Sequence, residues 1–372
     1  MKKILITSTD LMMIQFLVPH VRHLHENGFS VEIACSEVGG RMNEVRGALE
    51  EATDAIHCVC LERNPVSPRN LLGYRDMRRL LEENQYDIIW TNEPVMGVVT
   101  RLAARDARKS GTRVVYMCHG FHFFKGASAP NWLLFYPVER VMSRFCDCIT
   151  TINREDEARA QTFHAPRVEY IHGIGMDTQR LHPRNGDRTL RQELSLPQDA
   201  FLVLSVGELN ENKNHKVILQ ALSMIQDPSV HYCICGKGEL LERLTAQAVR
   251  LGIADRVHFL GYRTDVVDIC AQADVFVLPS YREGLSVASL EAMYCGLPLI
   301  TSRVRGSSDY LQEGVSGFLR DADDAVGFAD AIRTIQCNSD LRSLCSTRNR
   351  ETVVPYCMEN VQKEILTLFN SL

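Results

Sequence analysis

The strand–loop–helix unit that decides the fold reads Val275-Phe276-Val277-Leu278-Pro279-Ser280-Tyr281-Arg282-Glu283-Gly284-Leu285-Ser286-Val287-Ala288-Ser289-Leu290-Glu291-Ala292-Met293. Its first four residues form a short apolar run, which is typical of a buried strand that ends at Pro279. A loop containing Gly284 follows, and a helical pattern begins near Ser286. A buried strand that leads into a helix is the building block of an open parallel sheet covered by helices.

The same alternation repeats along the whole chain in two series. The first series predicts strands at 2–8, 30–35, 56–61, 87–91, 113–118, 146–151 and 167–171, with helices at 15–26, 71–84, 95–109, 132–144 and 154–163. The second predicts strands at 201–207, 230–235, 256–260, 274–278, 297–301 and 317–319, with helices between them. Residues 172–199, rich in Gly, Pro and polar residues, are the expected hinge between the two series.

This pattern predicts an α/β protein with two Rossmann-like domains that face each other across a cleft. We expect the domains to span 1–175 and 176–353, with a helix at 354–372 that crosses back to the first domain. A length of 372 residues fits two domains. Ligands of such sheets bind at the carboxyl ends of the strands, so the motifs that follow strands are the ones to examine.

Composition excludes several classes of protein. Hydrophobic residues make up 45% and charged residues 23%, which rules out a disordered chain, a collagen-like fibre and a small disulfide scaffold. The net charge of −5 argues against nucleic acid as a partner, because no basic excess exists to neutralise phosphates. Residues after 175 carry this whole net charge, so any phosphate site among them must be local.

Thirteen cysteines are spread along the chain without a Cys-x-x-Cys motif, which disfavours a zinc knuckle and fits a reducing compartment. Three pairs are spaced to lie on one face of a strand, where we expect them to pack as small apolar groups: Cys58/Cys60, Cys146/Cys148 and Cys233/Cys235. The apolar run at 4–6 is too short for a signal peptide, and no run approaches the ~18 residues of a membrane span. We therefore expect a cytoplasmic protein.

The strand–loop–helix unit at 275–293 also carries side chains and amides that suit a ligand. Unpaired amides at the helix start near Ser286 suit a phosphate. Glu283 in the loop and Glu291 on the helix are placed to accept hydrogen bonds from sugar hydroxyls on either side of a diphosphate. With Gly296 and Pro298 the motif becomes Pro-Ser-x-x-Glu-Gly-x-x-x-x-x-x-Glu-Ala-Met-x-x-Gly-x-Pro. It resembles that of the family 4 retaining glycosyltransferases of the GT-B fold, over residues 205 to 320.

The resemblance implies roles for these residues. Glu283 would contact the donor sugar and Glu291 the nucleotide ribose. The loop that holds the sugar phosphates would act mainly through its backbone, at Gly284, Leu285, Ser286 and Val287.

A second motif reads Val206-Gly207-Glu208-Leu209-Asn210-Glu211-Asn212-Lys213-Asn214-His215. Lys213 precedes a helix, where a cation opposes the helix dipole, so a functional role in neutralising a diphosphate leaving group is favoured. The resemblance places Gly207 and Lys213 in the donor site. Glu208 occupies the position of the family's usual arginine, a variant similar to the bacterial capsular and exopolysaccharide branch. Arg263 or Arg282 is then expected to help hold the phosphates, and the choice stays open.

Two glycine-containing strand ends complete the expected donor site. Cys235-Gly236-Lys237-Gly238-Glu239-Leu240-Leu241 begins like a dinucleotide-binding motif but lacks its third glycine, which disfavours a dehydrogenase. The resemblance implies that Gly236 lines the nucleotide site. It also places the base against the backbone near Leu260-Gly261-Tyr262-Arg263, where Arg263 is either a donor contact or a surface charge.

The predicted strand at 113–118 of the first series leads into the motif Cys118-His119-Gly120-Phe121-His122-Phe123-Phe124-Lys125-Gly126. His119 lies at the end of a strand and before a glycine turn, and this position favours a functional role. The resemblance implies that His119 touches the donor sugar. His122 is a candidate for acceptor contact. Asn92, which follows the strand at 87–91, is a second candidate of this kind.

Residues 121–145 combine aromatic and basic side chains. Two interpretations stay open: core packing of the helix at 132–144, and contact with a membrane surface. Asp321-Ala322-Asp323 has the form of a metal-binding Asp-x-Asp string, but we expect a loop or a helix cap there. The resemblance implies neither a metal nor another cofactor.

The sequence thus predicts a retaining glycosyltransferase of bacterial surface polysaccharide biosynthesis. Its expected donor is a nucleotide sugar, UDP-linked, and its expected acceptor a saccharide or a polyprenyl-diphosphate-linked saccharide. We expect no nucleic-acid partner, and a cytoplasmic location with peripheral contact to the inner membrane face. Two alternatives remain: a sugar-nucleotide epimerase of the same fold, and a non-catalytic partner subunit, which the loss of the arginine at Glu208 would fit.

Overall fold

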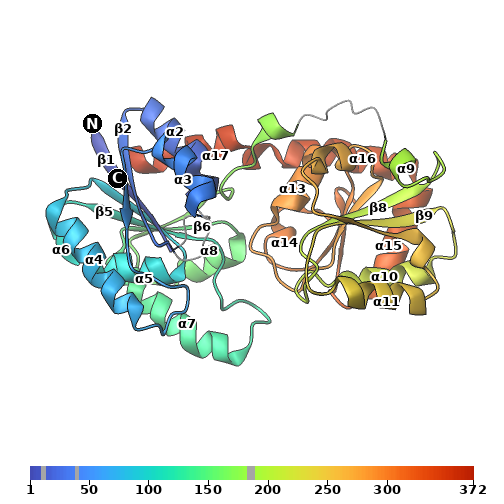
Figure 1. The fold of residues 1–372 in the computed structure, drawn as a ribbon, viewed down its shortest axis with the longest axis horizontal. Helices are drawn as coiled ribbons and strands as arrows, with labels where there is room; N and C mark the ends of the chain where they lie inside the picture. Colours follow the sequence, from blue (N-terminus) through green and yellow to red (C-terminus); the bar gives the residue numbers. More distant parts are fainter. Residues whose placement is uncertain (10–13, 38–41, 182–188) are drawn as a thin grey trace. The chain divides into compact units, whose positions relative to one another are not determined.

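The computed structural model describes residues 1–9, 14–37, 42–181 and 189–372. Within these ranges the chain divides into two compact units (Figure 1). Unit 1 comprises Met1–Gly175 and Glu359–Leu372, and unit 2 comprises Met176–Met358. Residues 182–188 of the expected hinge lie outside the described part of the chain.

Unit 1 is built on seven strands: β1 (Lys2–Ser8), β2 (Phe29–Cys35), β3 (Ala55–Cys58), β4 (Ile88–Asn92), β5 (Arg113–Cys118), β6 (Cys148–Thr151) and β7 (Arg167–Tyr170). Its helices are α2 (Val18–Glu26), α3 (Met42–Glu50), α4 (Arg69–Glu83), α5 (Pro94–Ala103), α6 (Arg105–Lys109), α7 (Ala129–Met142), α8 (Arg154–Ala160) and α17 (Met358–Asn370), with 3-10 turns at η1 (Gln15–Leu17) and η2 (Ser143–Phe145).

Unit 2 is built on six strands: β8 (Phe201–Val206), β9 (Val230–Cys235), β10 (Val257–Gly261), β11 (Val275–Leu278), β12 (Leu299–Ser302) and β13 (Gly317–Arg320). Its helices are α9 (Leu190–Glu193), α10 (His215–Met224), α11 (Leu241–Arg250), α12 (Val266–Cys270), α13 (Val287–Tyr294), α14 (Ser307–Tyr310), α15 (Ala325–Cys337) and α16 (Ser339–Thr352), with 3-10 turns at η3 (Thr178–Arg180), η4 (Ala254–Arg256) and η5 (Val354–Tyr356).

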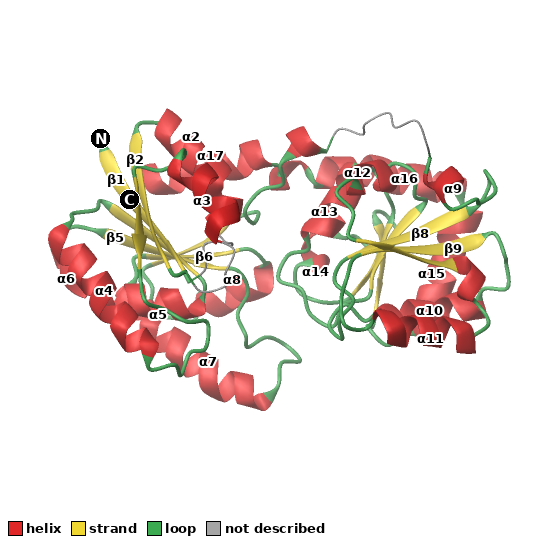
Figure 2. Cartoon of the chain, viewed as in Figure 1, coloured by secondary structure: helices red, strands yellow, loops and turns green. Residues whose placement is uncertain are grey.

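Both sheets are parallel, and in each the chain order reverses beside the first strand (Figure 2). Unit 1 has the order β3-β2-β1-β4-β5-β6-β7, so the chain moves outward from β1 in one direction and then restarts at β4 on its other side. Unit 2 repeats this with β10-β9-β8-β11-β12-β13. Loops that leave such neighbouring strands diverge, and the point between them at the carboxyl ends is where open α/β sheets bind ligands. These points are β1/β4 in unit 1 and β8/β11 in unit 2.

The sheet of unit 1 is buried on both faces, as parallel sheets are. Helices α4, α5 and α7 cover one face, and α2 and α17 cover the other (Figure 1). On the second face Trp90 of β4 lies edge-on between His20 of α2, at 6.0 Å, and Phe369 of α17, at 5.4 Å. Glu364 of α17 pairs with His172 at 2.6 Å, which fastens this late helix to unit 1.

Helix α7 is anchored to its sheet by a buried ion pair. Arg101 of α5 donates to Glu139 of α7 at 2.9 Å, and the hydroxyl of Tyr116 donates to the same carboxylate at 3.0 Å. Charge pairing with a further hydrogen bond is what makes a buried carboxylate tolerable. The opposite face of α7 is exposed and apolar, at Leu133, Leu134, Val138 and Val141.

The sheet of unit 2 is covered in the same way. Helices α10, α11 and α15 pack on one face around Val203, Val277 and Phe328. Helices α9, α12, α13 and α14 lie on the other face, where Phe276 and Met293 are buried. Within the part of the chain that the structure describes, no helix is both long and apolar enough to cross a bilayer.

The predicted strands are confirmed, with ends that differ by three residues at most. The predicted helix at 95–109 is wrong as a single element, because it is divided into α5 and α6. Helix α3 was not predicted. The expected burial of Cys58 and Cys60 is also wrong: β3 ends at Cys58, and both thiols are exposed, whereas the other two cysteine pairs are buried.

Candidate functional site

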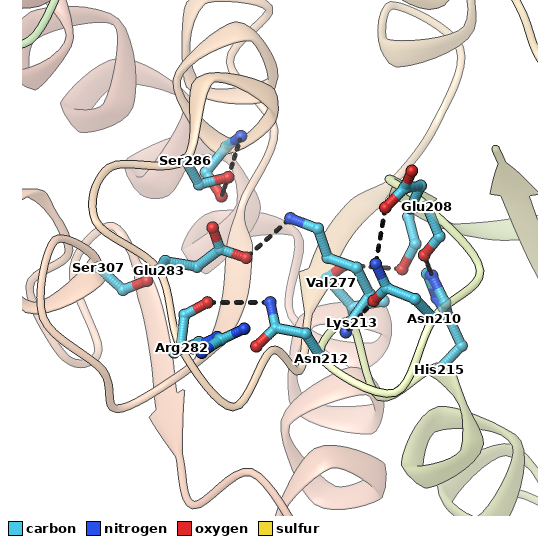
Figure 3. Close-up of polar contacts among 12 residues, drawn as sticks. Glu208, Asn210, Asn212, Lys213, His215, Val277, Arg282, Glu283, Ser286 and Ser307 are labelled. Carbon is cyan, nitrogen blue, oxygen red and sulfur yellow. Dashed lines mark hydrogen bonds and ion pairs between the residues drawn. The ribbon is translucent and has the colours of Figure 1, made fainter. Parts of the chain in front are cut away.

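The site of unit 2 is centred on an ion pair between two loops. Lys213 follows β8 and Glu283 follows β11, which are neighbouring strands at the reversal point of the sheet. The ammonium Nζ of Lys213 lies 2.8 Å from Oε1 of Glu283 (Figure 3). The two side chains are 21% and 11% exposed, so the pair is partly withdrawn from water but reachable by a ligand.

Asparagines hold the loop that carries Lys213. Asn210 accepts a hydrogen bond from the Lys213 amide at 3.0 Å, and its own amide group donates to the Glu208 carboxylate at 2.7 Å. Asn212 donates to the carbonyl of Arg282 at 3.1 Å (Figure 3). The Asn210 bonds order the loop after β8 around Lys213, and the Asn212 bond fastens this loop to the loop after β11 and so fixes Lys213 relative to Glu283.

Asn214 ends this loop in a left-handed backbone conformation, with φ 53°. Asparagine tolerates that conformation better than most residues. Its buried side chain donates to the carbonyl of Pro279 at 3.2 Å and to that of Ala322 at 2.7 Å. The loop is therefore also bound to the end of β11 and to the turn before α15.

His215 begins α10 and is hydrogen-bonded to the loop that carries Lys213. Its Nε2 lies 3.2 Å from the carbonyl of Glu208, and its Nδ1 lies 2.9 Å from the hydroxyl of Tyr232. Burial lowers the pKa of His215 to about 4, so the ring is neutral. Because a carbonyl only accepts, the single ring proton lies on Nε2, and Nδ1 accepts from Tyr232.

The start of α13 faces the same loop system. Ser286 caps the helix by accepting a hydrogen bond from the Ser289 amide at 3.2 Å. Gly306 closes on the loop so tightly that a Cβ there would lie 2.3 Å from the carbonyl oxygen of Gly284. Amides in the first turn of a helix lack intrahelical acceptors and carry the positive end of its dipole. Glu291 lies one turn and a half further along α13, and burial raises the pKa of Glu291.

The glycine-rich turn after β9 has a packing explanation. A Cβ on Gly236 would lie 1.8 Å from the carbonyl oxygen of Gly207, and one on Gly238 would lie 2.4 Å from that of Leu209. The two loops therefore touch backbone to backbone, which only glycine permits. A donor contact by Gly236 and Gly207 stays a prediction.

Arg263 differs from the expectation of a cation available to phosphates. Its guanidinium pairs with Asp265 at 2.6 Å and with Glu193 at 2.7 Å. Hydrogen bonds to Asp265 and then to Glu193 raise the pKa of Arg263, and its charge is balanced by the two carboxylates. Of the two arginines left open by the sequence, this pairing favours Arg282, an exposed residue next to Glu283.

Unit 1 brings together Asn92, which ends β4 at the reversal point, and His119, which follows the neighbouring strand β5. Nε2 of His119 donates to Oδ1 of Asn92 at 2.9 Å, since an amide oxygen only accepts. The residue is partly exposed, but burial of its imidazole lowers the pKa of His119 to about 4. The neutral ring is left with Nδ1 as a hydrogen-bond acceptor.

Glu93, next to Asn92, was missed by the sequence reasoning. It adopts φ 66° and accepts hydrogen bonds from the Ser8 hydroxyl and the Thr9 amide, both at 2.7 Å. A left-handed glutamate is strained, and such strain concentrates at functional sites. Ser8, Asn92, Glu93 and His119 line a cavity of about 10 Å³, with Phe16, Leu17 and Ile174.

The remaining candidates lie as follows. His122 is exposed and stacks on Phe135 of α7, with ring centroids 4.5 Å apart. Asp323 accepts a hydrogen bond from the Tyr281 hydroxyl at 2.6 Å, in a turn before α15, as expected of a loop. Among the described residues, no three His, Cys, Asp or Glu side chains are grouped so that they could hold a metal ion.

The residues that sequence reasoning missed are mainly supports. Asn210, Asn212 and Asn214 were quoted only as loop residues, yet Asn210 orders the loop that carries Lys213, and Asn212 and Asn214 bind that loop to other segments. Their signal was the spacing of three asparagines around one lysine. His215 was also quoted without a role; its partners are the Glu208 carbonyl in the same loop and the Tyr232 hydroxyl on β9.

Two family models together cover most of the chain. "Glycosyltransferase Family 4" matches residues 17–180, and "Glycosyl transferases group 1" matches residues 186–352. EpsD of Bacillus subtilis, which is named as a glycosyltransferase, is 33% identical over 100% of this chain and 97% of its own. An Escherichia coli relative, UDP-Gal:alpha-D-GlcNAc-diphosphoundecaprenol alpha-1,3-galactosyltransferase, is 27% identical over 82% of this chain and 79% of its own.

Solved structures of the same fold agree with these matches. HepE of Anabaena in complex with UDP superposes with a TM-score of 0.82 at 20% identity, over 100% of both chains. Sucrose-phosphate synthase of Thermosynechococcus elongatus superposes with a TM-score of 0.80 at 18% identity, over 100% of this chain and 99% of that one. At this identity the likeness concerns the two-sheet fold.

Proposed function

Because the chain belongs to the family 4 glycosyltransferases of the GT-B fold, we propose that it transfers a sugar, with retention of configuration, from a UDP-sugar to a saccharide linked to a lipid diphosphate. The observation that carries this proposal is the ion pair of Lys213 and Glu283 beside the start of α13. It sets a cation, a carboxylate and helix-end amides at the position where α/β sheets bind ligands.

The diphosphate is the part of the donor that these groups suit best. A leaving UDP gains negative charge as the bond to the sugar breaks. Lys213 supplies a positive charge, and the first amides of α13 supply oriented donors that need no rearrangement. In this acidic half of the chain the local arrangement, not bulk charge, attracts the phosphates.

The carboxylates are assigned to the two sugars of the donor. Glu283 binds the transferred sugar and Glu291 binds the ribose, as the family resemblance implies. We assign His119 of unit 1 to a sugar hydroxyl, which would donate a hydrogen bond to Nδ1 of the neutral ring. The acceptor hydroxyl then attacks from the face that the UDP leaves, which retains the configuration.

We further propose that transfer needs no metal ion. Lys213 and the α13 amides provide the positive charge that a divalent cation would otherwise bring to the diphosphate. The test is turnover after extensive treatment with a chelator. Unchanged turnover is expected, and a loss that Mg²⁺ or Mn²⁺ restores would contradict the proposal.

The proposed acceptor is a lipid-linked saccharide of a bacterial surface polysaccharide. The name of the Escherichia coli relative specifies a diphosphoundecaprenol acceptor. In this chain the outer face of α7 is apolar at Leu133, Leu134 and Val138, and exposed Arg140 and Arg144 lie beside it. An apolar stripe flanked by cations suits the anionic surface in which such a lipid is anchored, so we assign α7 to peripheral membrane contact.

The decisive experiment uses the purified chain with a panel of nucleotide sugars. Donors that bind the native state will raise its unfolding temperature, which identifies base and sugar together. The selected donor is then supplied with lipid-diphosphate-linked saccharides, and the product is analysed by NMR. Release of UDP with an unchanged anomeric configuration supports the proposal. Inverted products contradict retention, and conversion of the donor without acceptor indicates an epimerase instead.

A further inference from the structure

Unit 2 contains a second pocket, away from the edge that carries Lys213 and Glu283. Its volume is about 280 Å³, and its lining includes Cys270, Asp274, Cys295, Gly296, Pro298 and Arg342. Asp274 directly precedes β11 and Pro298 directly precedes β12, so the pocket lies at the amino ends of these strands. The proposed donor site lies at the carboxyl ends.

Two cysteines meet in the wall of this pocket. Cys270 is the last residue of α12, and Cys295 follows the last residue of α13. Both line the pocket, Cys270 within the apolar cluster under these helices and Cys295 packed against that cluster, and each thiol shifts the pKa of the other. Cys270 is buried and Cys295 is partly exposed. Both cysteines therefore face the pocket, and Cys295 is the more accessible of the two.

The surroundings shift the pKa values of the two thiols in opposite directions. The neighbouring Cys270 thiol lowers the pKa of Cys295, and the charge of Arg350 acts in the same direction against burial. Arg350 is held there by donating to the carbonyls of Tyr294 at 2.9 Å and Cys295 at 2.6 Å. The Cys295 thiol, together with burial, raises the pKa of Cys270 well above its usual range. A thiolate that is stabilised and accessible is the reactive form of cysteine.

We propose that Cys295 and Cys270 are an attacking and a resolving thiol, which small disulfides such as oxidised glutathione convert to an intramolecular disulfide. The Cys295 thiolate attacks one sulfur of the small disulfide, forms a mixed disulfide and releases one thiolate. Cys270 then loses its proton, attacks the Cys295 sulfur and releases the second thiolate. Two protein thiols are oxidised and one small disulfide is reduced to two thiols. The bond would tie the end of α13, one turn beyond Glu291, to α12.

The test is a peptide map of the reduced, full-length chain after exposure to oxidised glutathione under native conditions, with remaining thiols blocked before digestion. We expect a cross-linked peptide containing Cys270 and Cys295, lighter than the two reduced peptides by two hydrogen atoms. In Cys270→Ser the mixed disulfide should persist on Cys295, because no resolving thiol is present. Alkylation of Cys295 in the native wild type should be at least about tenfold faster than that of buried Cys345.

Cys337→Ser is the matched control, since Cys337 is an exposed thiol on α15 without this arrangement. This variant should form the same cross-link as the wild type. The proposal is overturned if glutathione modifies Cys58, Cys60 or Cys337 in the wild type while Cys270 and Cys295 remain reduced. It is also overturned if Cys270→Ser, shown by circular dichroism to be folded, carries no adduct on Cys295.

Discussion

The ammonium of Lys213 lies 2.8 Å from the carboxylate of Glu283, although the two residues are 70 positions apart in the chain. The contact exists because β8 and β11 are neighbours in the sheet despite two intervening strands. Each group holds the other in a fixed place before any ligand arrives. Such preorganised charge is the property that lets a site stabilise a transition state without rearranging.

Removing either member of this pair should abolish most of the activity. We expect Lys213→Ala and Glu283→Gln each to lower kcat by roughly 10²–10³-fold, because a preorganised charge next to the reacting centre is lost. The measurement is steady-state UDP release. Lys109→Ala, which removes an exposed lysine of unit 1, is the control and should leave turnover unchanged. Normal turnover in both site variants, with wild-type circular dichroism, would refute the site assignment.

Glu291→Gln should affect donor binding more than chemistry. A carboxylate on the ribose acts equally in the ground state and the transition state, so its loss raises KM and leaves kcat nearly constant. We expect roughly a tenfold rise in the KM for the donor. A fall in kcat at saturating donor, with KM unchanged, would instead place Glu291 at the transferred sugar.

Acid should destabilise both units through buried histidines. Burial lowers the pKa of His20 and of His215 to about 4, whereas an unfolded histidine titrates near 6.5. The folded state binds fewer protons between these values, so stability is complete above pH 6.5 and falls as the pH drops towards 4. Each histidine should lower the free energy of unfolding by about 2 kcal/mol at pH 5.

Urea denaturation at pH 7 and pH 5 measures this effect. His215→Asn should lose less stability between the two pH values than the wild type, because it lacks the buried imidazole that must take up a proton. Equal losses in His215→Asn and the wild type would show that His215 does not carry the effect.

Gly236→Ala should be severely destabilising. Its added methyl group would lie 1.8 Å from the carbonyl oxygen of Gly207, so a strand end must move. We expect a loss of at least about 3 kcal/mol in the free energy of unfolding, or no soluble protein. Gly47→Ala is the counterpart within α3, where nothing lies within 4 Å of the added carbon. It should stabilise by about 0.5–1 kcal/mol, and a milder effect at Gly236 than at Gly47 would contradict the close approach of the two loops.

Polar residues on the outer face of α7 should weaken membrane binding. Leu133 is 78% exposed and Leu134 is 51% exposed, so their replacement by glutamine removes apolar contact without disturbing the core. We expect the double variant to bind vesicles that contain anionic lipid at least about fivefold more weakly than the wild type. Val249→Gln, at a 63% exposed position on α11, should bind normally. Equal binding by all three proteins would exclude this face as the contact.

Most of the fold could be predicted because each buried strand is a short apolar run between polar loops. Burial on both faces of a parallel sheet leaves such a run almost no freedom in its composition. Helix α3 was missed although its amphipathic periodicity is comparable to that of α2, which was predicted. Cys60 was misplaced because β3 ends two residues before it, and strand ends are set by pairing with β2.

The site could be predicted residue by residue but not as an arrangement. Lys213 and Glu283 were both identified by their positions after strands, but their contact depends on strand order. Arg263 is the opposite case: the sequence left it open as a phosphate contact, but a carboxylate distant in the chain pairs with it. Nothing in its own motif reveals Glu193, a partner 70 positions away that balances its charge.

Helix α17 has a consequence for how the protein is made. It completes one face of the first sheet, beside Trp90, but is translated nearly two hundred residues after β7. At ribosomal rates of about 5–20 residues per second, the surface around Trp90 stays uncovered for about 10–40 s until α17 has been synthesised. The second unit can mature on the ribosome during that interval, while the first, although begun earlier, is finished later. We therefore expect aggregation of the nascent chain, and its binding by chaperones, to involve the amino-terminal unit.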